Sequence, residues 1–357
     1  MKITVLNARD LAPAHWDRWR ILQGENPDLD SPYFCADYVR IVGSIREDVF
    51  VAVLGSPGEP SGFFPFQRSR LGFGMPVGGR LSDFHGVIAP RGTTLDVSDL
   101  MRASGLVSWE FHALPVSQSA FAPHHAQTMG SHFVDTSKGL PGFEEEKRRA
   151  GSQQPRMLRS YRRRVLERFK KVEFVPHVTD TRVLDTLLEW KSRQYQESGS
   201  LDNWSIGWMR DLMRKIHAHQ GEEFSGALSA LFLDGELAVA HMGMRSRTAW
   251  HWWIPRHDEK FNDTHPGLLL LSMMIEEAPR FGVTRLDLGY GDEKYKLNLR
   301  SGEIPVARGR IELPSLAVSL RRWREGLETW VRGSRLLPVM RFPGRIFKRL
   351  EAWNRSR

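Results

Sequence analysis

A short motif in the first third of the chain carries two side chains suited to acid–base chemistry. Asp83 and His85 stand in the run LSDFHG, at the end of a strand-like segment. A carboxylate and an imidazole at one strand end can move a proton, with one group acting as the base and the other orienting it. The alternative is an Asp that turns the chain beside a partly exposed His. The motif therefore predicts either a proton-transferring pair or a plain turn.

Two further histidines lie on neighbouring predicted strands. If Ser246-Arg247 is a two-residue hairpin turn, His241 faces Trp252 and His251 faces Met242 across the hairpin. The two imidazoles would then point to opposite faces, so they cannot both line one cleft or share a metal ion. His241 is a candidate substrate contact, with a satisfied core histidine as the alternative.

The elements that must position these side chains are clearest from Ser225 to Leu299. Asp234 and Gly235 separate two alternating apolar runs, and Asp-Gly is a strong signal for a tight hairpin because both positions need φ > 0. Thr264 can cap the helix that follows, and Gly282 can end it. The stretch therefore predicts antiparallel strands that feed a strand–helix–strand crossover.

The rest of the chain reads as a mixture of helices and short strands. Ser31 is expected to cap an early helix. We expect helices over 11–22, 32–42, about 143–169, 180–197 and 204–219, and strands over 49–54, 63–68 and 172–178. The predicted units are residues 1–142, 143–312 and a tail, 313–357.

Composition limits the class of protein. The chain has 357 residues, 41% of them apolar, and Cys35 is its one cysteine, so no intramolecular disulfide can form. We expect a protein of the reducing cytoplasm, because the sequence shows neither a signal peptide nor a long apolar run. The net charge is +9, and residues 313–357 hold 11 Arg and Lys against 3 Glu, a net charge of +8.

The basic tail has an amphipathic pattern. Its apolar residues recur at helical spacing among arginines, at Leu316, Leu320, Trp323, Leu327 and Trp330, and again at Ile346, Leu350 and Trp353. Helices rich in Arg and Trp can lie on an anionic membrane surface, such as the inner face of the cell membrane. The alternative is that the apolar stripe packs on the protein core.

Several motifs resemble the FemAB-like and CelD-type acyltransferases, a branch of the N-acetyltransferase (GNAT) superfamily. The resemblance covers roughly residues 15 to 312 and is most specific from His265 to Leu299. The matching segments are SPYFCADYVR from Ser31, LSDFHGVI from Leu81, RSYRRRVLERFKKVEF from Arg159, Pro266-Gly-Leu-Leu269, Asp287-Leu-Gly289 and Tyr295-Lys296.

The resemblance implies an α/β (α+β) fold of two tandem GNAT-like acyl-CoA N-acyltransferase domains that share a cleft, followed by the basic helical tail. It implies an acyltransferase without a metal, which moves an acyl group, acetyl above all, from acyl-CoA to an amine or hydroxyl. The acceptor would be a sugar- or peptide-linked precursor of the cell envelope or of an exopolysaccharide. The alternatives are a FemAB-like enzyme that uses aminoacyl-tRNA and a non-catalytic, membrane-peripheral binding module of polysaccharide assembly.

The resemblance also implies roles for residues. Tyr295 would join Asp83 and His85 as a proton donor or oxyanion partner, although GDEKYK can equally be a solvated charged loop. The donor would be held at the helix start by His265, Gly267 and Leu268, where the helix dipole favours an anion, and the acceptor by His241, Asp287, Lys294 and Lys296.

The donor stays open at this point for two reasons. The Arg/Gln-x-x-Gly-x-Gly/Ala loop of ordinary acyl-CoA enzymes is replaced here by Asn262–Gly267. The run Arg162-Arg163-Arg164 can bind the phosphates of an RNA or of a nucleotide-linked substrate, or it can be a solvated helix face paired with Glu.

Overall fold

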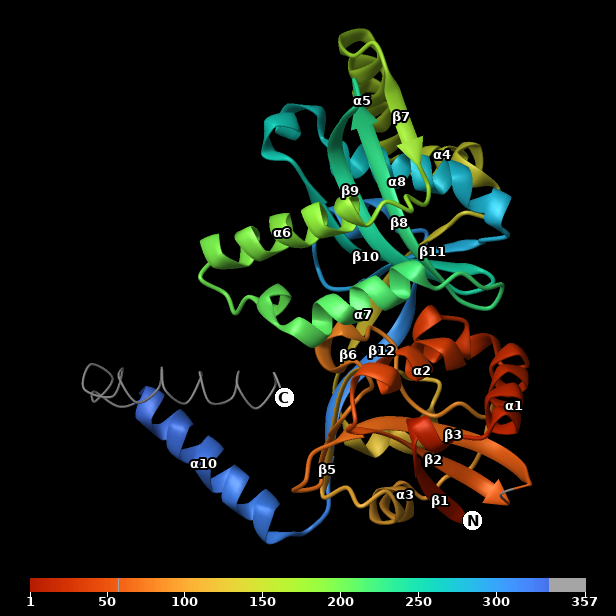
Figure 1. Cartoon of the computed structure of the whole chain (residues 1–357), viewed down its shortest axis with the longest axis vertical. Coiled ribbons are helices and arrows are strands. Elements are labelled where there is room, and N and C mark those ends of the chain that lie inside the picture. Colours follow the sequence, from red (N-terminus) through yellow and green to blue (C-terminus); the bar gives the residue numbers. More distant parts are fainter. Residues whose placement is uncertain (57, 334–357) are drawn as a thin grey trace.

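The computed structural model describes residues 1–56 and 58–333, with residues 327–333 described by their backbone alone. Strands and helices alternate along the chain in two halves (Figure 1). The strands are β1 (Ile3–Asn7), β2 (Val49–Ser56), β3 (Glu59–Arg68), β4 (Phe73–Met75), β5 (Ser108–Pro115), β6 (His125–Asp135), β7 (Val172–Val175), β8 (Ser225–Leu233), β9 (Glu236–Arg245), β10 (Ala249–His257), β11 (Arg285–Tyr290) and β12 (Gly302–Glu312). The α-helices are α1 (Pro13–Gly24), α2 (Ala36–Ile45), α3 (Val97–Ala103), α4 (Gly139–Arg149), α5 (Gln154–Arg168), α6 (Thr181–Glu197), α7 (Gly207–Ala218), α8 (Pro266–Glu277), α9 (Lys294–Leu299) and α10 (Leu316–Gly333).

All twelve strands belong to one sheet, in the order β1-β2-β3-β4-β5-β12-β6-β11-β10-β9-β8-β7. The two halves meet at β6, which pairs with β11 of the second half, and at β12, which comes last in the chain yet lies between β5 and β6. Because β12 crosses into the first half of the sheet, backbone hydrogen bonds join the two halves directly. This is the mixed α/β fold that the motifs predict.

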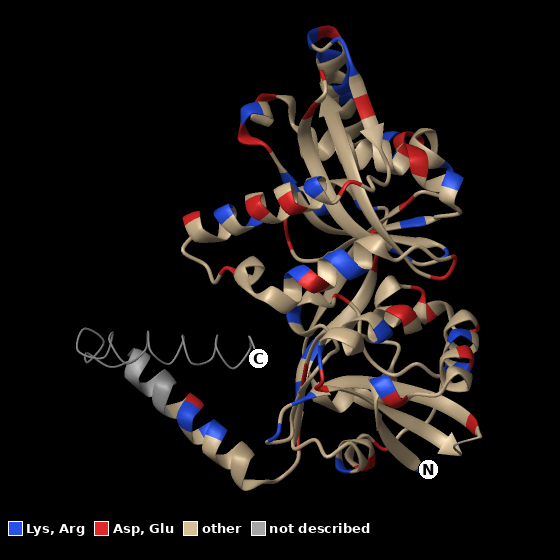
Figure 2. Ribbon diagram, viewed as in Figure 1, with Lys and Arg blue, Asp and Glu red and all other residues tan. Residues whose placement is uncertain are grey.

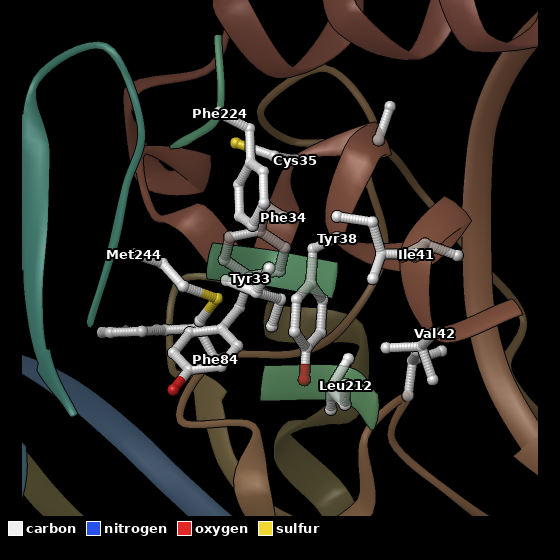
Figure 3. Close-up of a cluster of buried hydrophobic side chains, with 14 of the residues drawn as sticks. Tyr33, Phe34, Cys35, Tyr38, Ile41, Val42, Phe84, Leu212, Phe224 and Met244 are labelled. Carbon is white, nitrogen blue, oxygen red and sulfur yellow. The ribbon is translucent and has the colours of Figure 1, made fainter. Parts of the chain in front are cut away.

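The largest buried cluster also spans both halves. Tyr33 and Tyr38, from the first half, lie among Leu212, Phe224 and Met244 of the second (Figure 3). Each of these five side chains is at most 3% exposed. Burial of large apolar side chains is the main favourable term in folding, so the two halves stabilise each other through a shared core.

The local turn signals are confirmed in part. Asp234 (φ 49°) and Gly235 (φ 84°) form the tight turn between β8 and β9, as the Asp-Gly pair predicts. The expected cap of α8 is wrong: its N-cap is His265, at φ 51°, while the Thr264 hydroxyl donates to the carbonyl of Phe261. Gly282 ends a 3-10 turn that follows α8.

Two predicted helices are broken. The segment from Pro32 begins as a 3-10 turn, α2 starts only at Ala36, and the side chain of Ser31 caps neither element. The charged helix predicted over 143–169 is two helices, α4 and α5, which Gly151 (φ 71°) separates.

The predicted register of the β9–β10 hairpin is wrong. The backbone N–H of Ser246 donates to the carbonyl of Ala249, so the turn lies one residue further along than expected. His251 therefore pairs with Met244, and a β-bulge after His251 brings His241 opposite Pro255. The bulge decides the surroundings of both histidines.

Candidate active site

One carboxylate and one imidazole meet where the two halves join. Asp83 follows a 3-10 turn of the first half, and His251 stands on β10 of the second. Oδ2 of Asp83 lies 3.1 Å from Nε2 of His251. The Asp83 side chain is 22% exposed and the His251 side chain is fully buried. Asp83 is therefore the member of the pair that a substrate can reach, with His251 behind it.

Gly289 makes this approach possible. Its φ of 77° lies in the region that favours glycine, and a Cβ at this position would stand 2.6 Å from Oδ2 of Asp83. The same Cβ would be 3.7 Å from Cε1 of His251. The close approach of Asp83 explains why glycine occupies position 289 of the Asp287-Leu-Gly289 motif, since any side chain there would displace the Asp83 carboxylate.

The parallel strands β10 and β11 part beside this pair. Their register runs from Ala249↔Arg285 to His251↔Asp287 and stops there, although β10 continues to His257 and β11 to Tyr290. Beyond that position the two strands do not pair with each other. The Asp83–His251 pair stands at the fork between the two strands. Beyond His251 and Asp287, the backbone N–H and carbonyl groups that face the fork make no β10–β11 hydrogen bonds.

Three tyrosines surround the carboxylate. Tyr33 lies edge-on to His251 with ring centroids 5.1 Å apart, and burial, followed by the charge of Asp83, raises its pKa well above the ordinary value. Burial and then Asp83 raise the pKa of Tyr290 to about 12, and burial and then Glu293 raise that of Tyr295 to about 12. All three hydroxyls keep their protons at neutral pH, so they are available as hydrogen-bond donors.

A buried ionic network holds the fork in place. Nε of Arg285 lies 2.7 Å from Oδ1 of Asp287, whose side chain is 1% exposed, and Nη1 lies 3.5 Å from Oδ2 of Asp30. Burial raises the pKa of Asp287, and Arg285 opposes that effect. Asp30 also accepts from the hydroxyls of Ser246 and Thr248. The segment that leads to Tyr33 is thereby fixed on the β10–β11 edge.

Asp287 is enclosed in this structure. It was expected to bind the acceptor, but its carboxylate is enclosed and paired with Arg285. As the register partner of His251 in a parallel pair, it shares one face of the sheet with the imidazole.

His85 does not accompany Asp83 as the sequence suggested. Its Nε2 accepts the backbone N–H groups of His112 (3.0 Å) and Ala113 (3.1 Å), and burial followed by the nearby His112 holds its pKa well below the ordinary value. A ring that accepts two hydrogen bonds from backbone N–H groups of β5 has a structural role. The partner of Asp83 is His251 instead.

His241 likewise lies in the interior. Its ring is fully buried and stacks on Trp252 with centroids 4.4 Å apart, while its Nε2 accepts the backbone N–H of Trp253 (3.0 Å) at the β10 bulge. Burial, with His251 nearby, lowers the pKa of His241 to about 3. This is the alternative of a core histidine, although only Nε2 has a hydrogen-bond partner and the buried Nδ1 has none among the described residues.

The turn that follows β11 separates the two candidate lysines. Nζ of Lys296 donates to the carbonyl of Tyr290 (2.8 Å) and lies 3.1 Å from Glu293, so this buried ammonium holds the turn. Of the two lysines, only Lys294 has a solvent-exposed side chain.

The start of α8 offers limited anion binding. Pro266 has no N–H, and the N–H groups of Leu268 and Leu269 both point to the carbonyl of His265. Among the described residues this leaves Gly267 as the free backbone donor of the three expected positions. The His265 ring stacks on Tyr161 at 4.2 Å.

The neighbouring arginines of α5 are mostly paired. Arg162 contacts Glu276 at 2.7 Å, and Arg163 lies 3.8 Å from Glu167. Arg164 lies over the Tyr161 ring, 5.0 Å from its centroid. This is the arrangement of a solvated helix face with Glu partners, with Arg164 as the exception beside the α8 start.

Local patterns in the sequence indicate His251, Tyr33, Tyr290 and Gly289 only weakly as site residues. The sequence indicates only that His251 lies on a predicted strand. Tyr33 lies inside the SPYF segment that resembles the family's early helix. Nothing local indicates that these residues converge on Asp83, because Tyr33 lies 50 positions from it in the chain and the other three lie more than 160 positions away.

The comparisons with known proteins agree with this architecture. Residues 152–297 match the family described as "Acetyltransferase (GNAT) domain". No curated protein sequence matches the chain.

Three solved structures share the fold at low sequence identity. FemX has a TM-score of 0.57 at 10% identity, covering 87% of this chain and 96% of FemX. The C-terminal domain of a putative lysylphosphatidylglycerol synthetase from Agrobacterium fabrum has a TM-score of 0.54 at 13% identity, covering 89% and 96%. A tandem GNAT protein from the clavulanic acid biosynthesis pathway has a TM-score of 0.51 at 11% identity, covering 88% and 99%.

These three structures align along almost their whole length, so the likeness concerns the two-half fold and not one domain alone. The family match covers α5 to α9, the part of the second half that carries His251, the β10–β11 fork and Tyr295. Residues 152–297 thus resemble a GNAT acetyltransferase domain, and the protein is an acyltransferase.

Proposed function

We propose that the protein transfers an acyl group from acyl-CoA to an amine or hydroxyl of a cell-envelope or exopolysaccharide precursor, with Asp83 as the general base. The observation that carries this proposal is the 3.1 Å contact between Asp83 and His251. It brings an accessible carboxylate from one half to the fork of the GNAT domain in the other. The acceptor group would be sugar- or peptide-linked, and the reaction would take place in the cytoplasm.

The arrangement suggests a division of labour. Asp83 takes the proton from the attacking amine or hydroxyl, and His251 holds the carboxylate in place. The oxyanion that develops on the acyl carbon needs donors that keep their protons, and Tyr290 and Tyr295, with pKa values of about 12, meet that condition. The attacking nitrogen or oxygen bonds to the acyl carbon, and the bond from that carbon to the donor then breaks. With acyl-CoA the thiolate leaves and receives the proton that Asp83 took.

The donor would contact the start of α8. The Gly267 N–H and the positive end of the helix dipole suit an anionic group there, with Arg164 nearby. Lys294 would contact an anionic group of the acceptor. His265 and Leu268 would shape this end of the helix without supplying a free backbone donor.

One observation favours a second donor. A glycine loop holds a pyrophosphate with several backbone N–H groups, whereas the start of α8 has a single free one. An aminoacyl-tRNA donor does not need a pyrophosphate cradle. The fold is shared with FemX and with a domain of a putative lysylphosphatidylglycerol synthetase, whose name describes lysyl transfer to a lipid.

The test combines a donor screen with a matched pair of variants. We expect one of a panel of acyl-CoAs to stabilise the protein thermally and to release thiol in the presence of an acceptor. Asp83→Asn should lower kcat/KM by about 10² or more, the scale of a lost general base. Asp211→Asn, which changes an exposed carboxylate on α7, is the control and should be neutral.

Unchanged turnover in Asp83→Asn would reject the proposed base. If no acyl-CoA stabilises the protein or reacts, while RNase-sensitive aminoacyl transfer is observed, the second donor is correct. If the protein neither binds nor turns over any donor, it is a binding module rather than an enzyme of this kind.

A further inference from the structure

The helix α10 docks on the protein by one narrow face. Val318 is 4% exposed, and the guanidinium of Arg321 lies 4.8 Å from the centroid of the Phe73 ring. Arg321 also pairs with Glu312 at the end of β12. Its first turns are therefore held against the body, and the helix then leads away from it (Figure 1).

The apolar stripe of α10 lies on the other side. Leu316, Leu320 and Trp323 follow one another at spacings of four and three residues, and they are 91%, 67% and 67% exposed. At about 100° per residue, Val318 and Arg321 stand on the face opposite these three side chains. The predicted alternative, in which the stripe packs on the core, is wrong for these three described side chains.

Among the described residues nothing covers this apolar stripe, and a contiguous exposed apolar patch marks a site of interaction with another surface. Each of these side chains gains roughly 1.5–3 kcal/mol when it is fully removed from water, so they are a costly feature of a free surface. Among the described helices, none has the length and apolar character to cross a bilayer. The occupant must therefore be a surface on which the helix can lie.

The positive charge of the tail favours a negatively charged surface over a second copy of the helix. Residues 313–357 hold 11 Arg and Lys against 3 Glu, a net charge of +8, and Figure 2 colours the positions of basic residues along the described part of α10. A second copy of the same helix would bring the same positive charge against it. An anionic bilayer attracts such a segment by about 1 kcal/mol for each Lys or Arg near the surface.

We propose that α10 is a membrane-surface helix, which lies parallel to an anionic lipid bilayer with Leu316, Leu320 and Trp323 inserted at the level of the headgroups. Trp and Leu suit this depth because it is apolar on one side and wet on the other. The face that carries Val318 and Arg321 stays on the protein, so the helix connects the body of the protein to the lipid surface.

The test measures sedimentation of the full-length protein with vesicles of phosphatidylcholine alone and of phosphatidylcholine mixed with phosphatidylglycerol. The stripe variant carries Leu316→Ser, Leu320→Ser and Trp323→Ser, three exposed positions whose change should leave the fold intact. The matched control carries Ile21→Ser, Leu71→Ser and Leu166→Ser, three exposed apolar positions outside α10 that are 49%, 70% and 58% exposed. Circular dichroism and thermal unfolding confirm that all three proteins are folded.

We expect the wild-type and control proteins to sediment with anionic vesicles and far less with neutral ones. The stripe variant should lose about a hundredfold in partitioning, the effect of roughly 1 kcal/mol for each inserted side chain. Equal sedimentation of wild-type and stripe variant would overturn the proposal, as would binding that ignores the lipid charge. A dimer in solution that the stripe variant abolishes, without any vesicle binding by the wild type, would assign the stripe to a second copy instead. Because turnover is not measured, the outcome does not depend on the proposed reaction.

Discussion

Replacing Gly289 by alanine should separate the geometry of the candidate site from the stability of the fold. The added Cβ would stand 2.6 Å from Oδ2 of Asp83, whereas ordinary contacts of carbon atoms lie near 3.5 Å. The carboxylate must therefore move by about 0.5–1 Å, away from its 3.1 Å contact with His251. A misplacement of about 1 Å at a reacting group can cost about 10²-fold in rate.

The backbone strain of the same change can be measured independently. Gly289 has a φ of 77°, and an alanine in this region costs about 1–2 kcal/mol. Gly235 has a φ of 84°, and a Cβ there would meet nothing within 4 Å. Gly235→Ala therefore introduces comparable strain without a collision, which makes it the matched control.

The assay compares kcat/KM and thermal unfolding of both variants with the most active donor. We expect both proteins to unfold about 2–4 °C or more below the wild type. Only Gly289→Ala should lose about 10²-fold in kcat/KM. The reasoning would be refuted if Gly289→Ala kept its turnover, or if Gly235→Ala lost as much activity, since strain alone would then explain the effect.

Variants of Arg285, Tyr295 and His241 test the site and the core around it. Arg285→Met leaves the Asp287 carboxylate buried without its cation, so the free energy of unfolding in urea should fall by about 3–5 kcal/mol. Adding Asp287→Leu should recover most of this loss. An Arg285→Met protein as stable as the wild type would contradict this account. Tyr295→Phe should lower kcat by about 10² or more with little change in KM if its hydroxyl stabilises the oxyanion, and an unchanged kcat would exclude that role. Burial lowers the pKa of His241 from 6.5 to about 3. As the pH falls, the unfolded chain therefore takes up a proton at this histidine before the folded chain does. The contribution of His241 to the free energy of unfolding is complete above pH 6.5 and is lost as the pH falls toward 3. Between pH 6 and 4 the wild type should therefore lose up to about 1.4 kcal/mol per pH unit more than His241→Asn, measured by urea unfolding at each pH, and parallel pH curves for the two proteins would reject this account.

Local chemistry in the sequence predicted several elements well. The Asp234-Gly235 turn, the helix over 180–197 and the strands β2 and β3 depend on residues that are neighbours along the chain. The apolar spacing of the tail likewise predicted a helix from Leu316. The part of that pattern at Ile346, Leu350 and Trp353 lies outside the described residues.

Predictions that needed distant contacts were less successful. The pairing of Asp83 with His85 followed from their closeness in sequence, yet His85 turns to the backbone of β5. The lone Cys35 likewise indicated no role in the sequence, because it contacts Gln23 of α1 and the backbone carbonyl of Glu223, which follows α7.

The sequence alone thus determined which side chains were available: the carboxylate at Asp83, the glycine at Gly289, the tyrosine at Tyr295 and an acetyltransferase-like order of elements. The tertiary structure decided which of them meet. A turn shifted by one residue and a bulge on β10 set the surroundings of His251, and the strand order of a sheet shared by both halves brings Asp83 to it. Register and strand order depend on packing between distant segments, so no local pattern could have specified the contact.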